Sequence, residues 1–267
     1  MIEILSYAFM QKAFISGIVI AIACSLLGMF LVLRKFSLIG DGIAHISFGG
    51  VATGLLFNIT PFFGALLFGL IGSLGILNLK EKSHLHGDTA IGIVSHASLG
   101  IGIFIASIAR GFNVDILSYL FGSILSIRDT ELFLSVALAG AVIVFILSFY
   151  RELFYISFDE ESARVSGIRV NFLNSMLILL TSVTIVCSMN IVGLMLASAL
   201  IILPAASALQ LKSSFKRTLF YAVIISVFSV ISGIVISYYY DFAVSGTIVI
   251  LNAAVFLFLL SISKARA

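Results

Sequence analysis

The chain has 267 residues, of which 61% are hydrophobic and only 10% are Asp, Glu, Lys or Arg. Soluble domains carry about a quarter charged residues, so this composition excludes a soluble globular protein and indicates an integral membrane protein. The formal net charge of +3 is too small to suggest a nucleic-acid partner. Long apolar runs without strand-type alternation favour an all-α bundle over a membrane barrel.

Nine apolar segments are candidates for helices that cross the membrane. A helix needs about 20 apolar residues to cross about 30 Å of hydrocarbon. The predicted segments are 13–33, 42–57, 61–79, 89–109, 130–149, 170–187, 190–209, 218–238 and 244–262. Residues 1–12 are expected to form a short interfacial helix before the first span. No linker divides the chain, so we expect one polytopic transmembrane domain, residues 1–267, of eight to nine spans.

Two features modify this series of spans. The apolar run 115–127 is too short to cross, so it suits a re-entrant or interfacial helix, and the span count depends partly on it. Pro204 interrupts the span 190–209; proline frees the carbonyl four residues earlier and bends a helix. A structural kink is the simpler interpretation of Pro204, and a wall of a transport pathway is the alternative.

The basic residues predict the orientation, because cytoplasmic loops of membrane proteins carry an excess of Lys and Arg. With the 150–169 loop in the cytoplasm, twelve of the 15 basic residues fall inside. The three that fall outside are Lys12, Arg110 and Arg128. This bias predicts an external N-terminus and a cytoplasmic C-terminus.

Asp41 and His45 lie in a short polar stretch, 34–45, that separates two apolar runs. On a helix, residues four apart share one face, with about 5–6 Å between their Cβ atoms. A carboxylate and an imidazole at that distance can share one divalent cation, such as zinc or manganese. The alternative is that Asp41 caps the helix while His45 forms an internal hydrogen bond.

Two ligands do not complete a zinc site, which usually has three or four. A third ligand could come from His96, in a separate span, or from the same pair on a partner subunit. The alternative for His96 is a hydrogen bond to the neighbouring Ser95 or Ser98. His84 and His86 lie in a predicted cytoplasmic loop, where a transient metal contact or plain solvation would explain them.

The segment 158–167 has the pattern of a short helix in a cytoplasmic loop. Asp159 is a good N-cap, Glu160 and Glu161 suit a first turn, and Gly167 suits a C-terminal stop. This helix could be an ordinary surface element, or it could dock into a cleft of a soluble partner and transmit movement to the spans.

The chain lacks the Gly-x4-Gly-Lys-Ser/Thr phosphate-binding loop, so it does not bind ATP by that means. If the protein drives uphill transport, a separate subunit is expected to supply the energy. An ATP-independent secondary carrier and a membrane scaffold without transport activity are the rival interpretations.

Four motifs occur in a recognisable order along nearly the whole chain. They are Gly40-Asp41-x3-His45, the run from Asp115 to Gly122, the 158–167 loop helix, and the run from Val192 to Ala206. With these motifs the chain resembles the membrane permeases of zinc and manganese ABC importers, most closely the bacterial zinc permeases of the ZnuB type. The Val-Ser-His-Ala stretch around His96 looks like the zinc branch. Ser123 stands where zinc-type relatives carry an acid, which makes a ligand role at that position doubtful.

The resemblance implies a subunit that performs no bond chemistry and holds no tightly bound cofactor. Zn²⁺ would be the transported substrate, with Mn²⁺ or Fe²⁺ as alternatives, and Asp41, His45 and His96 the metal ligands. It also implies a homodimer in the bacterial inner membrane, two copies of an ATP-binding subunit below it, and an extracytoplasmic metal-binding protein above it. The residues implied to couple the permease to the ATPase are Phe158, Asp159, Glu160, Glu161, Ala163, Arg164 and Gly167.

The predicted orientation raises a question about the depth of the metal pair. Arg34 and Lys35 fall on the cytoplasmic side, so Asp41 and His45 are expected in the cytoplasmic half of their span. Either the pair forms a release-side gate, or the 34–45 segment folds back into the bundle and forms a central site. We favour the central site.

Overall fold

The computed structural model describes residues 6–83, 87–108, 119, 122, 127–189 and 191–265. Within these residues the chain forms 11 helices and no strand. The helices are α2 Ala8–Leu33, α3 Ile39–Leu56, α4 Pro61–Ser83, α5 Gly87–Ile108, α7 Asp129–Ser148, α8 Tyr150–Phe158, α9 Glu160–Val165, α10 Val170–Ser188, α11 Leu194–Leu209, α12 Phe215–Tyr240 and α13 Val244–Ala265. The predicted all-helical class is confirmed.

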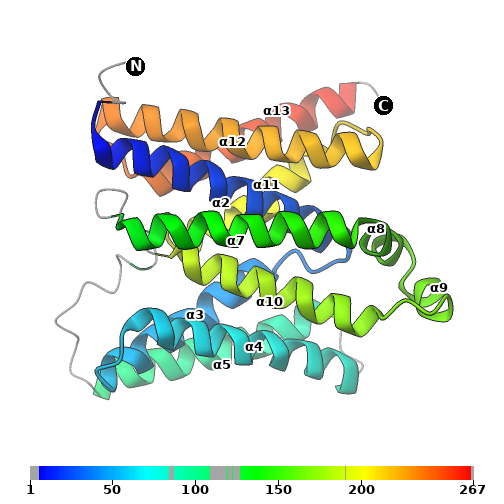
Figure 1. Cartoon of the computed structure of the whole chain (residues 1–267), viewed down its shortest axis with the longest axis horizontal. Coiled ribbons are helices and arrows are strands. Elements are labelled where there is room, and N and C mark those ends of the chain that lie inside the picture. The colour runs from blue at the N-terminus through cyan, green and yellow to red at the C-terminus, as the bar shows by residue number, and fades with distance from the viewer. Residues whose placement is uncertain are drawn as a thin grey trace.

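The long helices lie side by side along the longest axis of the molecule, with α8 and α9 at one end (Figure 1). Helix α2 packs against α7, α11 and α12, while α3, α4 and α5 form a second group. Helix α10 contacts α4 and α7 and so joins the two groups. The start of α2 and the end of α13 lie at opposite ends of the bundle.

Seven of the described helices are long and apolar enough to cross a membrane: α2, α4, α5, α7, α10, α12 and α13. The prediction of eight to nine spans is therefore not confirmed. Helix α11 is apolar but has only 16 residues, about 24 Å at 1.5 Å per residue. Helix α3 carries Asp41 and His45, which reduce its hydropathy. Most of the 115–127 run lies outside the described residues.

The predicted interfacial helix at residues 1–12 lies partly outside the described residues, which begin at residue 6. Ala8 to Lys12 of this segment belong to α2, which runs without interruption to Leu33. No Gly or Pro breaks its first two turns, and Lys12 within them forms an ion pair with Asp129 of α7 at 2.6 Å. The first helix is therefore longer than its apolar run.

Glycine allows several helices to touch backbone to backbone, as two pairs illustrate. A Cβ atom on Gly28 of α2 would lie 1.9 Å from the carbonyl oxygen of Ile201 in α11. A Cβ on Gly50 of α3 would lie 2.3 Å from the carbonyl oxygen of Gly64 in α4, and the reverse holds for Gly64. Such small residues permit dense van der Waals packing where lipid supplies no hydrophobic drive between helices.

Candidate functional site

The side chains of Asp41 and His45 meet on one face of α3. The Asp41 Oδ2 and His45 Nε2 atoms are 3.5 Å apart, and the two side chains are 48% and 26% exposed. Asp41 is the third residue of α3, whose N-cap is Leu38, so the alternative that Asp41 caps the helix is wrong. A carboxylate in the first turn still interacts favourably with the helix dipole. The pair presents one oxygen ligand and one nitrogen ligand from adjacent turns.

The start of α3 lies well inside the bundle rather than at its end. Gly28, five residues before the end of α2, contacts Ile201 of α11. Gly40 contacts Ser198, which precedes Ile201 by about one turn of α11 and lies farther from the α9 end of the bundle.

The connection between α2 and α3 passes back into the bundle to reach this point (Figure 1). Phe36 and Ile39 in and after this connection are buried. Gly42 packs on Ile91 and Ser95, which lie one to two turns into α5. The 34–45 segment therefore folds back, and the start of α3, which carries Asp41 and His45, packs against α11 through Gly40 and against α5 through Gly42.

His96 does not join the pair. Its Nδ1 atom lies 2.7 Å from the Gly92 carbonyl oxygen and 3.4 Å from the Ser95 hydroxyl, and its side chain is exposed on α5. In the part of the chain that the structure describes, no group of three or more His, Cys, Asp or Glu side chains could hold a metal ion. Two protein ligands are thus what one described chain brings together.

The structure does not place four of the remaining polar positions relative to this pair. His84, His86, Asp115 and Ser123 lie outside the described residues. Asp241 is the C-cap of α12, in a left-handed conformation with φ of 54°.

Helix α9 is delimited at both ends as the sequence predicts. The Asp159 carboxylate accepts hydrogen bonds from the Ser162 backbone N–H at 2.9 Å and from its hydroxyl at 2.5 Å, and these bonds lower the pKa of Asp159. Gly167, with φ of 83°, follows the helix. Its N–H and that of Ile168 bond to the carbonyls of Arg164 and Ala163, which is the Schellman arrangement.

The helix is shorter than the predicted 158–167 segment. Phe158 is the last residue of a separate helix, α8, which the sequence analysis treated as part of a loop. Asp159 divides α8 from α9 because its extended backbone, with φ of −147°, interrupts the helical path. Ala163 is buried, whereas Glu161 is exposed.

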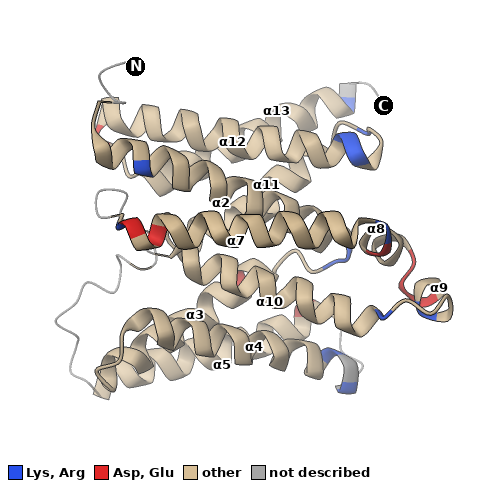
Figure 2. Ribbon diagram, viewed as in Figure 1, with Lys and Arg blue, Asp and Glu red and all other residues tan. Residues whose placement is uncertain are grey.

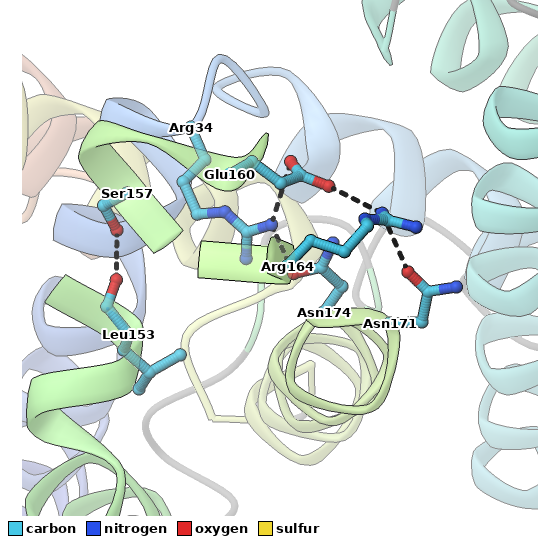
Figure 3. Close-up of polar contacts among 7 residues, drawn as sticks. All are labelled: Arg34, Leu153, Ser157, Glu160, Arg164, Asn171 and Asn174. Carbon is cyan, nitrogen blue, oxygen red and sulfur yellow. Dashed lines mark hydrogen bonds and ion pairs between the residues drawn. The ribbon is translucent and has the colours of Figure 1, made fainter. Parts of the chain in front are cut away.

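A buried arginine links α9 to the segment that precedes the Asp41–His45 pair. The Arg34 side chain is 4% exposed and lies 3.7 Å from Glu160 of α9. Its guanidinium also donates to the side-chain oxygen of Asn174 in α10. Figure 3 shows Arg164 continuing this network, 3.5 Å from Glu160 and 3.1 Å from Asn171. The end of α2 therefore meets two consecutive helices from much later in the chain, α9 and α10, at one charged cluster.

Sequence reasoning missed this cluster, because it used Arg34 only as an indicator of topology. A signal was present: Arg34 directly follows a long apolar helix and precedes Asp41 by seven residues. Asn174 is a polar residue one turn inside a predicted span. Neither residue on its own indicates the other, because 140 residues separate them.

Replacing Glu160 with alanine is expected to destabilise the protein. Glu160 is the one described carboxylate in an ion pair with Arg34, and removing it leaves a buried cation without its counter-charge. Glu160 is itself partly exposed, so we expect the free energy of unfolding to fall by about 1–3 kcal/mol. Breaking a fully buried ion pair would cost more. Thermal unfolding of the purified protein in detergent measures the effect.

Glu161→Ala is the matched control, because Glu161 lies on the same turn and is exposed. We expect its unfolding temperature to equal that of the unchanged protein. Equal unfolding temperatures for Glu160→Ala and Glu161→Ala would show that the Arg34 cluster contributes nothing to stability.

These features can be compared with known proteins. The family model described as "ABC 3 transport family" matches residues 6–263. The chain belongs to this family.

Named members are similar to the chain over nearly its whole length. The manganese transport system membrane protein MntC of Listeria monocytogenes is 34% identical over 256 residues, which cover 96% of this chain and 91% of that protein. A probable iron transport system membrane protein of Haemophilus influenzae is 35% identical over 267 residues, covering 100% and 98%. The chain is thus similar to transport proteins that are named for different metals.

Solved structures agree with this assignment. One chain of PsaBC from Streptococcus pneumoniae in complex with Fab superposes with a TM-score of 0.83 at 34% identity, over 96% of this chain and 92% of that one. An inward-facing metal-chelate type ABC transporter has a TM-score of 0.75 at 17% identity, over 97% and 86%. The second likeness concerns the fold alone.

As a member of the ABC 3 family, the chain is a multi-pass membrane permease of a metal ABC importer and not itself an enzyme. The expected family is therefore confirmed. Its zinc branch is not, because MntC is named for manganese and the Haemophilus influenzae protein for iron.

Proposed function

We propose that this permease imports Mn²⁺, with Asp41 and His45 as transient ligands along the pathway. The observation that carries the proposal is the Asp41–His45 pair, 3.5 Å apart near the start of α3, where Gly40 and Gly42 pack against α11 and α5 inside the bundle. An ionisable pair at such a depth in a membrane protein is by default a functional site. The metal is cargo, and no tightly bound cofactor is proposed.

The ligand set suits a site that must release its ion. Two protein ligands leave most of the coordination sphere to water, backbone oxygens or a partner subunit, whereas a closed four-ligand cage would hold the ion. Carboxylate and water favour Mn²⁺, and imidazole is also acceptable to Fe²⁺ and Zn²⁺. The 34% identity to a protein named for manganese transport supports Mn²⁺.

Zn²⁺ is the second candidate, because a mixed oxygen and nitrogen pair is also a normal part of a zinc site. His96 would serve as a further zinc ligand only after its ring leaves the Gly92 carbonyl, or when it is supplied across a subunit interface. The metal therefore has to be decided by transport.

Helix α9 is the proposed contact with an ATP-binding subunit. Val165 on α9 is 90% exposed, and Phe158 at the end of α8 is also exposed, so apolar side chains are available to a partner. The Arg34 cluster connects α9 to the polypeptide just before Asp41, so movement of α9 could reach the metal pair. We propose a homodimer of permeases with two ATP-binding subunits and an extracytoplasmic metal-binding protein.

The charge distribution supports a cytoplasmic position for α8 and α9. Figure 2 shows most Lys and Arg residues at that end of the bundle, as the bias of cytoplasmic loops requires. We therefore propose an external N-terminus and a cytoplasmic C-terminus in the bacterial plasma membrane.

Uptake by vesicles tests the substrate. The permease, its ATP-binding subunit and its binding protein are reconstituted together in vesicles. The accumulation of Mn²⁺ and of Zn²⁺ is then followed with and without ATP. We expect ATP-dependent accumulation of Mn²⁺ that exceeds that of Zn²⁺ severalfold. Faster Zn²⁺ accumulation would overturn the metal assignment, and equal uptake without ATP would favour a secondary carrier.

A further inference from the structure

A groove on the outside of the bundle is separate from the Asp41–His45 pair. It has a volume of about 520 Å³, within the range of about 300–1,000 Å³ that is usual for small-molecule sites. Helix α2 lies between α7 and α12 (Figure 1) and forms the floor. The apolar lining is Leu26 of α2, Ile143, Ile146 and Leu147 of α7, and Leu219 of α12.

The apolar part of the groove opens toward lipid. Leu147 on its rim is 71% exposed, and the neighbouring Val144 is also exposed. Only 22% of the apolar window of α7 is buried inside the bundle. In a membrane, such a surface faces hydrocarbon rather than water, so the occupant of the groove must have an apolar portion.

One end of the groove is polar and positively charged. Arg151 of α8 and Lys216 of α12 line it and are exposed, and the Lys216 ammonium lies 6.0 Å from the ring centroid of Tyr150. Among the described residues that line the groove, Glu152 is the only carboxylate. No charged side chain of α2 or α7 lines the groove, so its described lining carries two cations and one anion.

Apolar walls with a cationic end match the chemistry of an anionic phospholipid. Basic pockets between transmembrane helices at the cytoplasmic side bind acidic headgroups, and this end of the bundle carries most of the basic residues (Figure 2). We propose that the groove binds an anionic phospholipid, with its phosphate between Arg151 and Lys216 and an acyl chain along Leu26, Ile146 and Leu219. Binding does not depend on which metal the permease carries.

The bound lipid would stabilise the position of α8, the helix that leads into α9. Phe215, next to Lys216, packs its ring 4.9 Å from that of Phe154 and 6.3 Å from that of Phe158. Helix α8 is therefore held to α12 by aromatic contacts beside the proposed headgroup. A phosphate that bridges Arg151 and Lys216 would add a second tie between the same helices.

Lipid selectivity of the purified full chain tests the proposal. Retention and thermal stabilisation are compared for phosphatidylglycerol and phosphatidylcholine with identical acyl chains, and for inorganic phosphate alone. We expect phosphatidylglycerol to be retained and to raise the unfolding temperature more than phosphatidylcholine does, while phosphate alone has no effect. The double variant Arg151→Gln, Lys216→Gln should weaken phosphatidylglycerol retention by about tenfold to thirtyfold, because each cation contributes about 1 kcal/mol.

Arg169→Gln with Lys212→Gln is the matched control, because it removes two exposed cations that do not line the groove. It should retain phosphatidylglycerol as the unchanged protein does. Equal retention of the two lipids, or equal losses in both double variants, would overturn the site. These outcomes are separate from the transport proposal, since none of them involves metal uptake or ATP.

Discussion

Substitution of Asp41 by asparagine or of His45 by alanine is expected to abolish most metal uptake. Each change removes one of the two proposed ligands, whose side chains lie 3.5 Å apart. Loss of groups that merely orient a ligand costs about 10–100-fold in metal affinity or activity, so loss of a direct ligand should cost at least as much. Uptake of radioactive manganese by vesicles that contain the complete importer measures the effect.

The fold should survive both substitutions, which makes the result interpretable. The side chains of the pair are 48% and 26% exposed, and an ion pair so exposed contributes about 0–1 kcal/mol to stability. The unfolding temperature of each variant should therefore stay close to that of the unchanged protein. Normal uptake by a folded His45→Ala protein would remove this residue from the pathway.

His96→Ala separates the two-ligand site from a three-ligand site. His96 is exposed and bonded to its own helix, so we expect its replacement to leave Mn²⁺ uptake nearly unchanged. A loss as large as that for His45→Ala would show that His96 enters the coordination sphere during transport.

Gly28→Val is expected to prevent correct folding of the bundle. Even a Cβ atom would lie 1.9 Å from the Ile201 carbonyl oxygen and 2.7 Å from its carbonyl carbon, and backbone atoms cannot rotate away as a side chain can. Helices α2 and α11 would have to separate, which should cost about 3 kcal/mol or more. The yield of monodisperse protein and its unfolding temperature measure this loss.

Gly140→Ala in α7 is the control for the same kind of change in another helix. A Cβ atom there meets nothing within 4 Å, and alanine is a better helix former than glycine by about 1 kcal/mol. We expect an unchanged or higher unfolding temperature. A normal unfolding temperature for Gly28→Val would contradict the backbone contact.

The contact at Gly28 also positions the metal pair. Helix α11 carries both Ile201, which meets Gly28, and Ser198, which meets Gly40 at the start of α3. A displaced α11 would shift the turn that holds Asp41. Milder substitutions such as Gly28→Ala are therefore expected to reduce uptake even in the fraction of protein that folds.

Local sequence was sufficient to predict much of the helical framework. The predicted span 61–79 corresponds to α4, Pro61–Ser83, and 244–262 corresponds to α13, Val244–Ala265. The cap at Asp159 and the stop at Gly167 were also predicted correctly, because a cap depends on a few neighbouring residues. Helix α8 was missed, since its charged Arg151 and Glu152 follow an apolar span and resemble the start of a loop.

Tertiary structure alone decided where the polar side chains meet. Spacing along one helix predicts that Asp41 and His45 share a face. Whether His96 joins them depends on how α5 packs, and in the structure its ring bonds to its own helix. The depth of the pair follows from the close contacts of Gly28 and Gly40 with α11, and the counter-charge of Arg34 comes from a helix more than a hundred residues away. Hydropathy is a sum over neighbouring residues and therefore predicts which segments enter a membrane, whereas long-range packing determines which groups face one another inside it.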